Sequence, residues 1–315
     1  MDLNITYITL TGHIDVHRYG YLYFFIMLNA YILIICCNVS IVSLTVTQKN
    51  LHEPMYVFIS ALLLNSILFS TAIYPKLLAD FLSEKQVISY QACLFQVFLF
   101  YSLSCSEFML LAAMAYDRYV SICKPLHYTT IMRKTTVIVL LVSAWIIPAC
   151  HVALPLSLLA NQKLCKFSLN GLFCNNSFNS LHCISTGRLS IIGVIVVFDV
   201  VLLPILFIIL TYTKILIIAY QSCGEVRKKA AQTCLPHLFV LINFSCLFTY
   251  DFTIVKLQSD FPPKARFIMT LQIVVYTPIC NPIIYGLKMK EISTHLKMLF
   301  CPVRVNRCIG TCIHL

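Results

Sequence analysis

The fold of this chain is decided by Met114-Ala115-Tyr116-Asp117-Arg118-Tyr119-Val120-Ser121-Ile122-Cys123-Lys124-Pro125-Leu126-His127-Tyr128. This stretch follows a long apolar run and places an acid, a base and a phenol side by side at Asp117, Arg118 and Tyr119. A membrane edge tolerates an arginine only where the side chain is paired or reaches water. We therefore expect this stretch to mark the point where a membrane-spanning helix meets water.

The composition extends this interpretation to the whole chain. Of its 315 residues, 59% are hydrophobic and 11% are charged, and the mean hydropathy is +0.85. A soluble domain carries about 25% charged residues, and a helix crosses a bilayer with roughly 20 mostly apolar residues. The sequence predicts an all-α membrane protein, a bundle of seven transmembrane helices. The expected spans lie near residues 21–46, 55–79, 93–119, 136–157, 189–218, 234–257 and 266–287.

Basic residues predict the orientation. Most of the 23 Lys and Arg flank the spans on the side of Arg118, which the positive-inside rule assigns to the cytoplasm. Met1–Gly20 is polar and lacks the apolar core of a signal peptide. We expect an extracellular tail at 1–20, a membrane domain at 21–287 and a cytoplasmic tail at 288–315. The net charge of +11 then reflects topology and contact with lipid headgroups, with no nucleic-acid partner.

Further motifs follow in order along the chain. Leu51–Tyr56, Thr211–Tyr212, Lys229–Leu238 and Pro278–Tyr285 accompany the opening stretch. Together they resemble the motifs of odorant (olfactory) receptors, a branch of the rhodopsin-like G-protein-coupled receptors. The resemblance covers nearly the whole chain, and its details look most like fish odorant receptors.

The resemblance implies a function. Such a receptor binds a small odorant between its helices and activates a heterotrimeric G protein, usually the stimulatory olfactory type that raises cyclic AMP. It would reside as a multi-pass protein in the plasma membrane, in olfactory sensory neurons.

The resemblance also assigns a switch. In the family, the acid at Asp117 restrains Arg118 at rest, and the arginine swings toward the opening bundle on activation. Taken alone, this pair is equally well explained as an interfacial anchor, and Pro282 as a static kink rather than a hinge. The neighbouring motifs favour the switch. The implied coupling and switch residues are Asp117, Arg118, Tyr119, Tyr212, Lys229, Asn281, Pro282 and Tyr285.

Several cysteines and modification motifs lie in the expected loops and terminal tails. Of 16 cysteines, four fall on the expected outer side, and four cysteines allow three pairings. The resemblance implies the pairs Cys93–Cys174 and Cys165–Cys183. Asn4-Ile5-Thr6 is a glycan acceptor, and the acceptor at Asn175 is weaker because a bridged loop restricts access. After the seventh span, a mixed basic and apolar pattern predicts a short amphipathic helix, followed by the palmitoylation candidate Cys301.

Polar residues inside the expected spans form a second group. Glu107 lies deep in the third span, where an isolated carboxylate must face the bundle, be protonated or hold a cation. Asn38, Asn65 and Asn281 can line the same interior. A sodium site that uses Glu107 and a neutral hydrogen-bonded cluster explain this group equally well.

The ligand is expected in the half of the bundle away from Arg118, because pockets between helices are mostly apolar with a few polar anchors. Asp199 and Asp251 could contact an amine or another polar odorant, although Asp251 could as readily pair with Lys256 or Arg266. The family usually has an aromatic residue at Ser245, and the neighbouring Phe244 can substitute for it. Ordinary core packing is an alternative for each apolar position. The candidate pocket residues are Phe100, Tyr101, Ser104, Cys105, Asp199, Phe248, Asp251 and Phe252.

Other functional classes fit the sequence less well. It shows no nucleophile–base pair, metal-ligand spacing or glycine-rich phosphate loop, so we expect neither an enzyme nor a metal or cofactor. A non-sensory receptor for an amine, lipid or peptide is the nearest alternative. A transporter is less favoured because we find neither internal repeats nor short broken spans.

Overall fold

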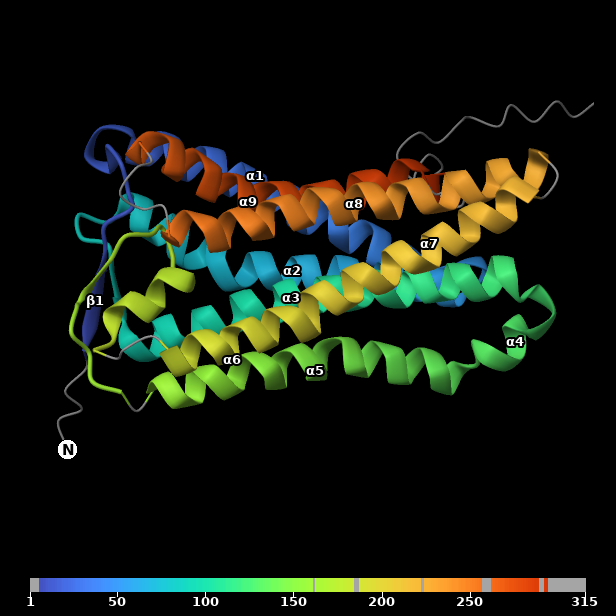
Figure 1. Ribbon diagram of the computed structural model, residues 1–315. Helices are drawn as coiled ribbons and strands as arrows, with labels where there is room; N and C mark the ends of the chain where they lie inside the picture. The colour runs from blue at the N-terminus through green and yellow to red at the C-terminus, as the bar shows by residue number, and fades with distance from the viewer. Residues whose placement is uncertain are drawn as a thin grey trace, which may run out of the picture.

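The computed structural model describes residues 6–160, 162–183, 187–221, 224–256, 262–288 and 292–293. Its long helices run side by side as an elongated bundle, with β1 at one end and α4 at the other (Figure 1). We call these the sheet end and the α4 end. The long helices are α1 (Val16–Thr47), α2 (Pro54–Leu82), α3 (Tyr90–Cys123), α5 (Lys134–Ala160), α7 (Leu203–Gln221), α8 (Gly224–Lys256) and α9 (Pro263–Lys288). The short ones are η1 (Lys49–Leu51), η2 (Pro125–His127), α4 (Tyr128–Ile131), η3 (Asn176–Leu181), α6 (Gly187–Val197) and a π-helical turn, η4 (Phe198–Leu202).

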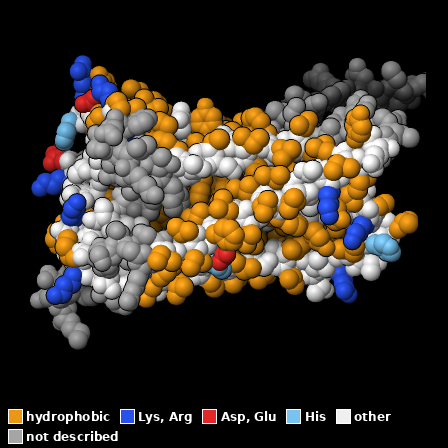
Figure 2. All heavy atoms as spheres, in the orientation of Figure 1, with side chains coloured by type: hydrophobic (Ala, Val, Ile, Leu, Met, Phe, Trp, Pro, Cys, Tyr) orange, Lys and Arg blue, Asp and Glu red, His pale blue; other side chains and the backbone are white. Residues whose placement is uncertain are grey.

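The helices have the length and composition of membrane spans. In the described part of the chain, six are long and apolar enough to cross a membrane, and α8 contains a shorter apolar stretch, His237–Asp251, within the expected sixth span. Hydrophobic side chains cover the length of the bundle, whereas Lys and Arg side chains gather toward its two ends (Figure 2). The mainly helical, multi-pass architecture that the sequence predicted is therefore confirmed.

The central helix of the bundle is α3. Most of its span is buried inside the protein, whereas α1, α5 and α7 leave most of theirs exposed on the outside. It contacts α2, α5, α7 and α8. A residue on α3 can therefore meet partners from most of the other helices, and both halves of the candidate site use this helix.

A small sheet, which the all-α prediction missed, covers the sheet end. Strand β1 (Tyr7–Leu10) lies between β2 (Val87–Ser89) and β3 (Ser168–Leu169), antiparallel to the former and parallel to the latter. Side chains alternate along β1, with Ile8 and Leu10 buried. Because α1 begins at Val16, the segment expected as a tail up to residue 20 contributes to both the sheet and the first helix.

Close backbone approaches hold the first residues on the bundle. A Cβ atom added to Gly20 in α1 would lie 2.3 Å from the carbonyl oxygen of Phe81 in α2. One added to Gly12 would lie 2.5 Å from the carbonyl carbon of Gly171, and the Gly12 N–H donates to the Gly171 carbonyl oxygen at 3.2 Å. Only glycine fits at these two contacts without a shift of the backbone.

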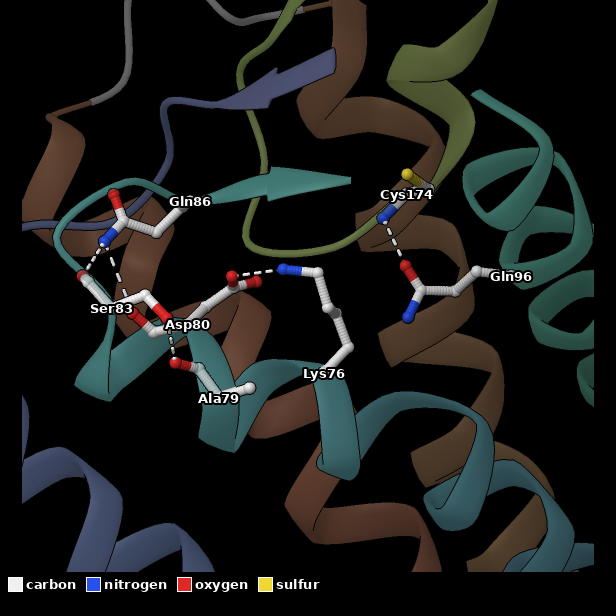
Figure 3. A network of polar contacts seen from close by, with 7 residues as sticks. All are labelled: Lys76, Ala79, Asp80, Ser83, Gln86, Gln96 and Cys174. Atoms are coloured by element: carbon white, nitrogen blue, oxygen red, sulfur yellow. Dashed lines mark hydrogen bonds and ion pairs between the residues drawn. The ribbon is translucent and has the colours of Figure 1, made fainter. Parts of the chain in front are cut away.

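Polar contacts lie at the C-terminal end of α2 and in the loop that follows it (Figure 3). Lys76 and Asp80, one turn apart, form an ion pair. Beyond the helix end, the Gln86 side-chain amide donates to the carbonyl oxygen of Ser83 at 2.7 Å. The Gln86 amide thereby satisfies a backbone carbonyl at the end of the helix, where intrahelical donors are lacking.

Two disulfides tie the loop of residues 162–183 together and to α3. They join Cys93 to Cys174 and Cys165 to Cys183, the pairs that the resemblance implied. Next to the first, the Gln96 side-chain oxygen accepts a hydrogen bond from the backbone N–H of Cys174 at 3.0 Å (Figure 3). The loop is thereby fixed over the sheet end of the bundle.

Candidate functional site

At the α4 end, Asp117 is held from two sides. Its Oδ2 accepts from the Arg118 guanidinium, with Nε at 3.0 Å, and its Oδ1 accepts from the Tyr128 hydroxyl at 2.8 Å. The Asp117 side chain is fully buried and the Arg118 side chain is 12% exposed. Burial and the neighbouring carboxylate raise the pKa of Tyr128 above its ordinary value, so this hydroxyl stays protonated as a donor. The expected ion pair between Asp117 and Arg118 is therefore formed, and Tyr128 is hydrogen-bonded to the same carboxylate.

A histidine stands between the two tyrosines of the expected switch. His237 in α8 lies with Nδ1 3.2 Å from the hydroxyl of Tyr285, and its ring stacks at 6.5 Å on Tyr212. All three side chains are buried. Tyr119 is half-buried against the core, and the side chain of Lys229 lies outside the described residues although α8 includes its backbone. An approach of the two tyrosines would require His237 to move.

Asn281 joins the interior polar residues. Its side-chain amide donates to Glu107 Oε1 at 2.9 Å and to the Ser66 hydroxyl at 3.1 Å. Asn65 turns elsewhere, because it donates to the Leu103 carbonyl oxygen and accepts from Trp145. Of the three asparagines expected beside Glu107, Asn281 is thus the one bonded to it among the described contacts. Sodium binding at Glu107 stays a prediction.

The third asparagine compensates for the proline in α9. Pro282 has no N–H, so the carbonyl four residues earlier, at Pro278, loses its helical donor. Asn38 in α1 donates to that carbonyl oxygen at 2.9 Å. Both asparagine and proline are buried. The carbonyl that Pro282 leaves without a helical donor is therefore satisfied across the bundle by another helix.

In the half of the bundle toward the sheet end, Asp251 in α8 is the centre of a polar group. Its Oδ2 accepts from the Tyr101 hydroxyl at 2.6 Å and its Oδ1 accepts from the Asn175 amide at 3.0 Å. The expected alternative, a pair with Arg266, is not formed among the described residues, and the side chain of Lys256 lies outside them. This arrangement connects α3, α8 and the loop. Because the Asn175 amide is buried and bonded, it is closed to a glycan.

Aromatic side chains surround this polar group. Phe100 packs on Phe173 of the loop at 5.2 Å, and Phe108 packs on Phe244 and Phe248 at 4.8 and 5.4 Å. Phe244 is buried and packs on Phe108, and its substitution for the family's aromatic residue at Ser245 stays a prediction. Buried aromatic rings from α3, α8 and the loop and the bonded pair of Asp251 and Tyr101 therefore lie in the same half of the bundle.

Four further pocket candidates have different outcomes. Ser104 and Cys105 are buried on α3, and Ser104 donates to the carbonyl oxygen of Phe100. The side chain of Phe252 lies outside the described residues. The expected placement of Asp199 was wrong: its side chain is 39% exposed on the outside of the bundle, 3.6 Å from His151 in α5. The π-helical turn η4 starts at Phe198 and changes which way Asp199 faces.

With this geometry in place, comparisons with known proteins are informative. The family model described as olfactory receptor matches residues 26–302. The chain belongs to the olfactory receptor family. It is 35% identical over 279 residues to human olfactory receptor 6F1, covering 87% of this chain and 89% of the relative. It is 32% identical over 301 residues to human olfactory receptor 11A1, with 94% of each covered. It is 33% identical over 295 residues to mouse olfactory receptor 6E1, covering 92% and 93%.

Membership in the olfactory receptor family agrees with the geometry. These proteins are G-protein-coupled receptors and not enzymes, as the sequence predicted. In this olfactory receptor, the central helix α3 carries Tyr101 toward one end and Asp117 toward the other. Candidate ligand residues and candidate coupling residues are therefore parts of one continuous helix.

Sequence reasoning missed several residues of this olfactory receptor. Tyr128 closes the opening stretch, and its position directly after His127 gave no sign that it reaches back to Asp117. His237 stood within a quoted motif without a role. Asn175 was considered only as a glycan acceptor. Each has a partner on another element, which spacing along the chain does not show.

Proposed function

We propose that this olfactory receptor binds a small odorant between α3, α8 and the loop of residues 162–183, and activates a heterotrimeric G protein at its α4 end. The G protein is of the stimulatory olfactory type, and its activation raises cyclic AMP. The names of the relatives support the sensory part of this proposal.

The observation that carries the proposal is the placement of two polar groups on α3. Tyr101, bonded to Asp251, and Asp117, bonded to Arg118 and Tyr128, are separated by 16 positions of one helix, or about 24 Å at 1.5 Å per residue. A ligand that rearranges the first group shifts α3 relative to its neighbours. The second group has two arrangements available, because Arg118 can leave Asp117 for water or a partner.

The chemistry of the first group suggests the kind of ligand. An odorant that replaces Tyr101 or Asn175 at the Asp251 carboxylate needs a hydrogen-bond donor, such as an ammonium or hydroxyl group. The rest of the molecule must suit the aromatic lining formed by Phe100 and Phe108. We propose a mostly apolar odorant with one donor group.

The proposed orientation places the sheet end outside the cell. Residues 1–20 are then extracellular, with a glycan at Asn4, and residues 288–315 are cytoplasmic, with Cys301 available for palmitoylation; Asn4 and Cys301 lie outside the described residues. Lys229 lies on the cytoplasmic side. The receptor functions as a multi-pass protein of the plasma membrane in olfactory sensory neurons.

The coupling proposal is tested in cells that express the chain with a cyclic AMP reporter. Amines are screened first, because they combine an apolar body with one donor group, and amino acids, bile acids and nucleotides follow as more polar classes. With an active odorant, Arg118→Ala should abolish the response at matched surface expression. Arg133→Ala removes an exposed charge near the same end and should leave the response intact. A full response from Arg118→Ala would contradict the proposed coupling role.

The ligand proposal has its own test. Asp251→Asn should raise the half-maximal odorant concentration about tenfold, the loss of roughly one good hydrogen bond to a charged group. Tyr101→Phe removes the hydroxyl that competes with the odorant for Asp251 and should lower that concentration. Asn29→Ala, on the exposed surface of α1, is the control. An unchanged concentration in both variants would place the odorant elsewhere.

A further inference from the structure

A cavity of about 40 Å³ lies at the sheet end, next to the Asp251 group, because Asn175 lines the cavity and also donates to Asp251. Its walls are Thr11 and Gly12 from the N-terminal segment, Asn170–Leu172 from the loop, and the first two turns of α9, including Arg266 and Thr270. Three separate parts of the chain therefore enclose it. A cavity of this size holds roughly three water molecules, so any ligand within it is small.

Arg266 is the charged member of the lining. Its Nη1 is buried and has no hydrogen-bond partner among the described residues, which also provide no carboxylate in an ion pair with it. A buried guanidinium N–H without an acceptor destabilises the folded protein by about 1–3 kcal/mol relative to a hydrogen-bonded one. This cavity wall therefore presents an unsatisfied positive donor.

The neighbouring acceptors are already engaged. The Leu169 carbonyl oxygen accepts from the Thr11 N–H and hydroxyl, and the Gly171 carbonyl oxygen accepts from the Gly12 N–H. Asn175 uses its amide oxygen for the Ser177 N–H and its amide nitrogen for Asp251. Within the described part of the chain, none of these bonded groups is directed to Arg266, which leaves room for an acceptor that these residues do not supply.

We propose that this cavity is a binding site for a small anion, with Arg266 as its main ligand. A short carboxylate suits it best, because the guanidinium fork binds a carboxylate through two parallel hydrogen bonds. Lys and Arg side chains outnumber Asp and Glu side chains on the visible surface of the sheet end, which favours the approach of anions (Figure 2). The bound anion joins α9 to the N-terminal segment and the loop, and thereby stabilises the sheet end.

The experiment uses the purified full-length receptor in lipid nanodiscs, with acetate as the probe. At constant ionic strength, the melting temperature is measured while sodium gluconate is replaced by sodium acetate, and separately by sodium chloride. Gluconate is too large for the cavity. We expect a saturable rise of roughly 2–4 °C with acetate, because a ligand that binds only the folded state stabilises it. A rise with chloride at lower concentration would identify a halide as the preferred small anion, and no rise with either salt would overturn the proposal.

Matched variants locate the effect. Arg266→Gln should remove the rise, whereas Lys264→Gln, an exposed charge in the same turn, should retain it. Arg266→Lys keeps the charge without the fork and should weaken acetate binding at least fivefold, which provides a readout if Arg266→Gln does not fold. A retained rise in Arg266→Gln, or an equal loss in Lys264→Gln, would contradict the site. A rise seen only after Asp260→Asn would identify the occupant as the chain's own carboxylate and overturn the proposal.

Discussion

The side-chain amide nitrogen of Asn38 lies 2.9 Å from the carbonyl oxygen of Pro278, the carbonyl that Pro282 leaves without a helical donor. The same amide also donates to the Ile34 carbonyl oxygen within α1. One buried side chain thus connects α1 to the part of α9 that precedes Pro282. The two helices contact one another along this region.

Replacing Asn38 by Leu should destabilise the receptor by about 1–3 kcal/mol, because a buried carbonyl oxygen loses its partner. The measurement is thermal unfolding of the purified protein. Asn29→Leu is the control, since Asn29 is exposed on the same helix and bonds only locally to the Phe25 carbonyl oxygen in the described contacts. Equal stability of both variants would show that Pro278 needs no support from α1.

Tyr128→Phe should raise basal cyclic AMP in cells, on the proposed coupling. The substitution removes the hydrogen bond to Asp117 Oδ1 and leaves Arg118 as the remaining described partner of that carboxylate. A lost bond to a charged group is worth about 1.5–3 kcal/mol, enough to change a two-state ratio more than tenfold. Tyr220→Phe removes a highly exposed hydroxyl and should leave basal signalling unchanged. Unchanged basal signalling in Tyr128→Phe would argue against a restraining role.

Gly20→Ala should disturb the packing of α1 on α2. The new methyl group would lie 2.3 Å from the Phe81 carbonyl oxygen, so the helices must separate, which costs about 1–3 kcal/mol. Surface delivery and thermal unfolding measure the effect. Gly193→Ala is matched in chemistry but has open space around the added atom, and it should be neutral. If the two alanine variants behave alike, the close approach at Gly20 is not limiting.

The sheet end should lose stability in acid. Burial, and to a lesser extent the positive charge of Lys76, lower the pKa of His13 from 6.5 to about 4. The unfolded chain therefore takes up a proton near pH 6.5 that the folded chain resists until about pH 4. The contribution of His13 to stability is complete above pH 6.5 and falls as the pH drops toward 4.

Thermal unfolding at pH 7.5 and pH 5 measures this dependence. His13→Gln should reduce the difference between the two melting temperatures, and His182→Gln should do the same, because burial also lowers the pKa of His182. His17→Gln, at an exposed position, is the control. An undiminished difference in the His13 and His182 variants would assign the acid sensitivity to other groups.

The sequence predicted the helices because their signal is long. A run of roughly 20 apolar residues has few explanations other than a membrane span. An error of several residues in where the run begins or ends does not change that assignment. The four-residue alternation from Tyr7 to Leu10 is too short to stand out in a polar leader. Its pairing depends on Val87–Ser89 and Ser168–Leu169, which are distant in the chain.

Side-chain partners were harder to predict than the helices that carry them. The pairing of Asp117 with Arg118 was implied by the resemblance, and the structure contains it. Asp251 was expected near basic residues of its own region, yet its partners come from α3 and the loop. For Asp199, the sequence showed only an acid within an apolar span, and it gave no sign of the π-helical turn in which this residue lies.

The central position of β1 has a consequence for biosynthesis. β1 leaves the ribosome well before β3, which pairs with it, because α1, α2, α3 and α5 lie between them in the chain. During that interval one edge of β1 has no strand beside it, and an unpaired edge invites pairing with other chains. The sheet end therefore forms late in synthesis. A tag fused directly before Thr6 would interfere most with this step, during the interval in which β1 waits for β3.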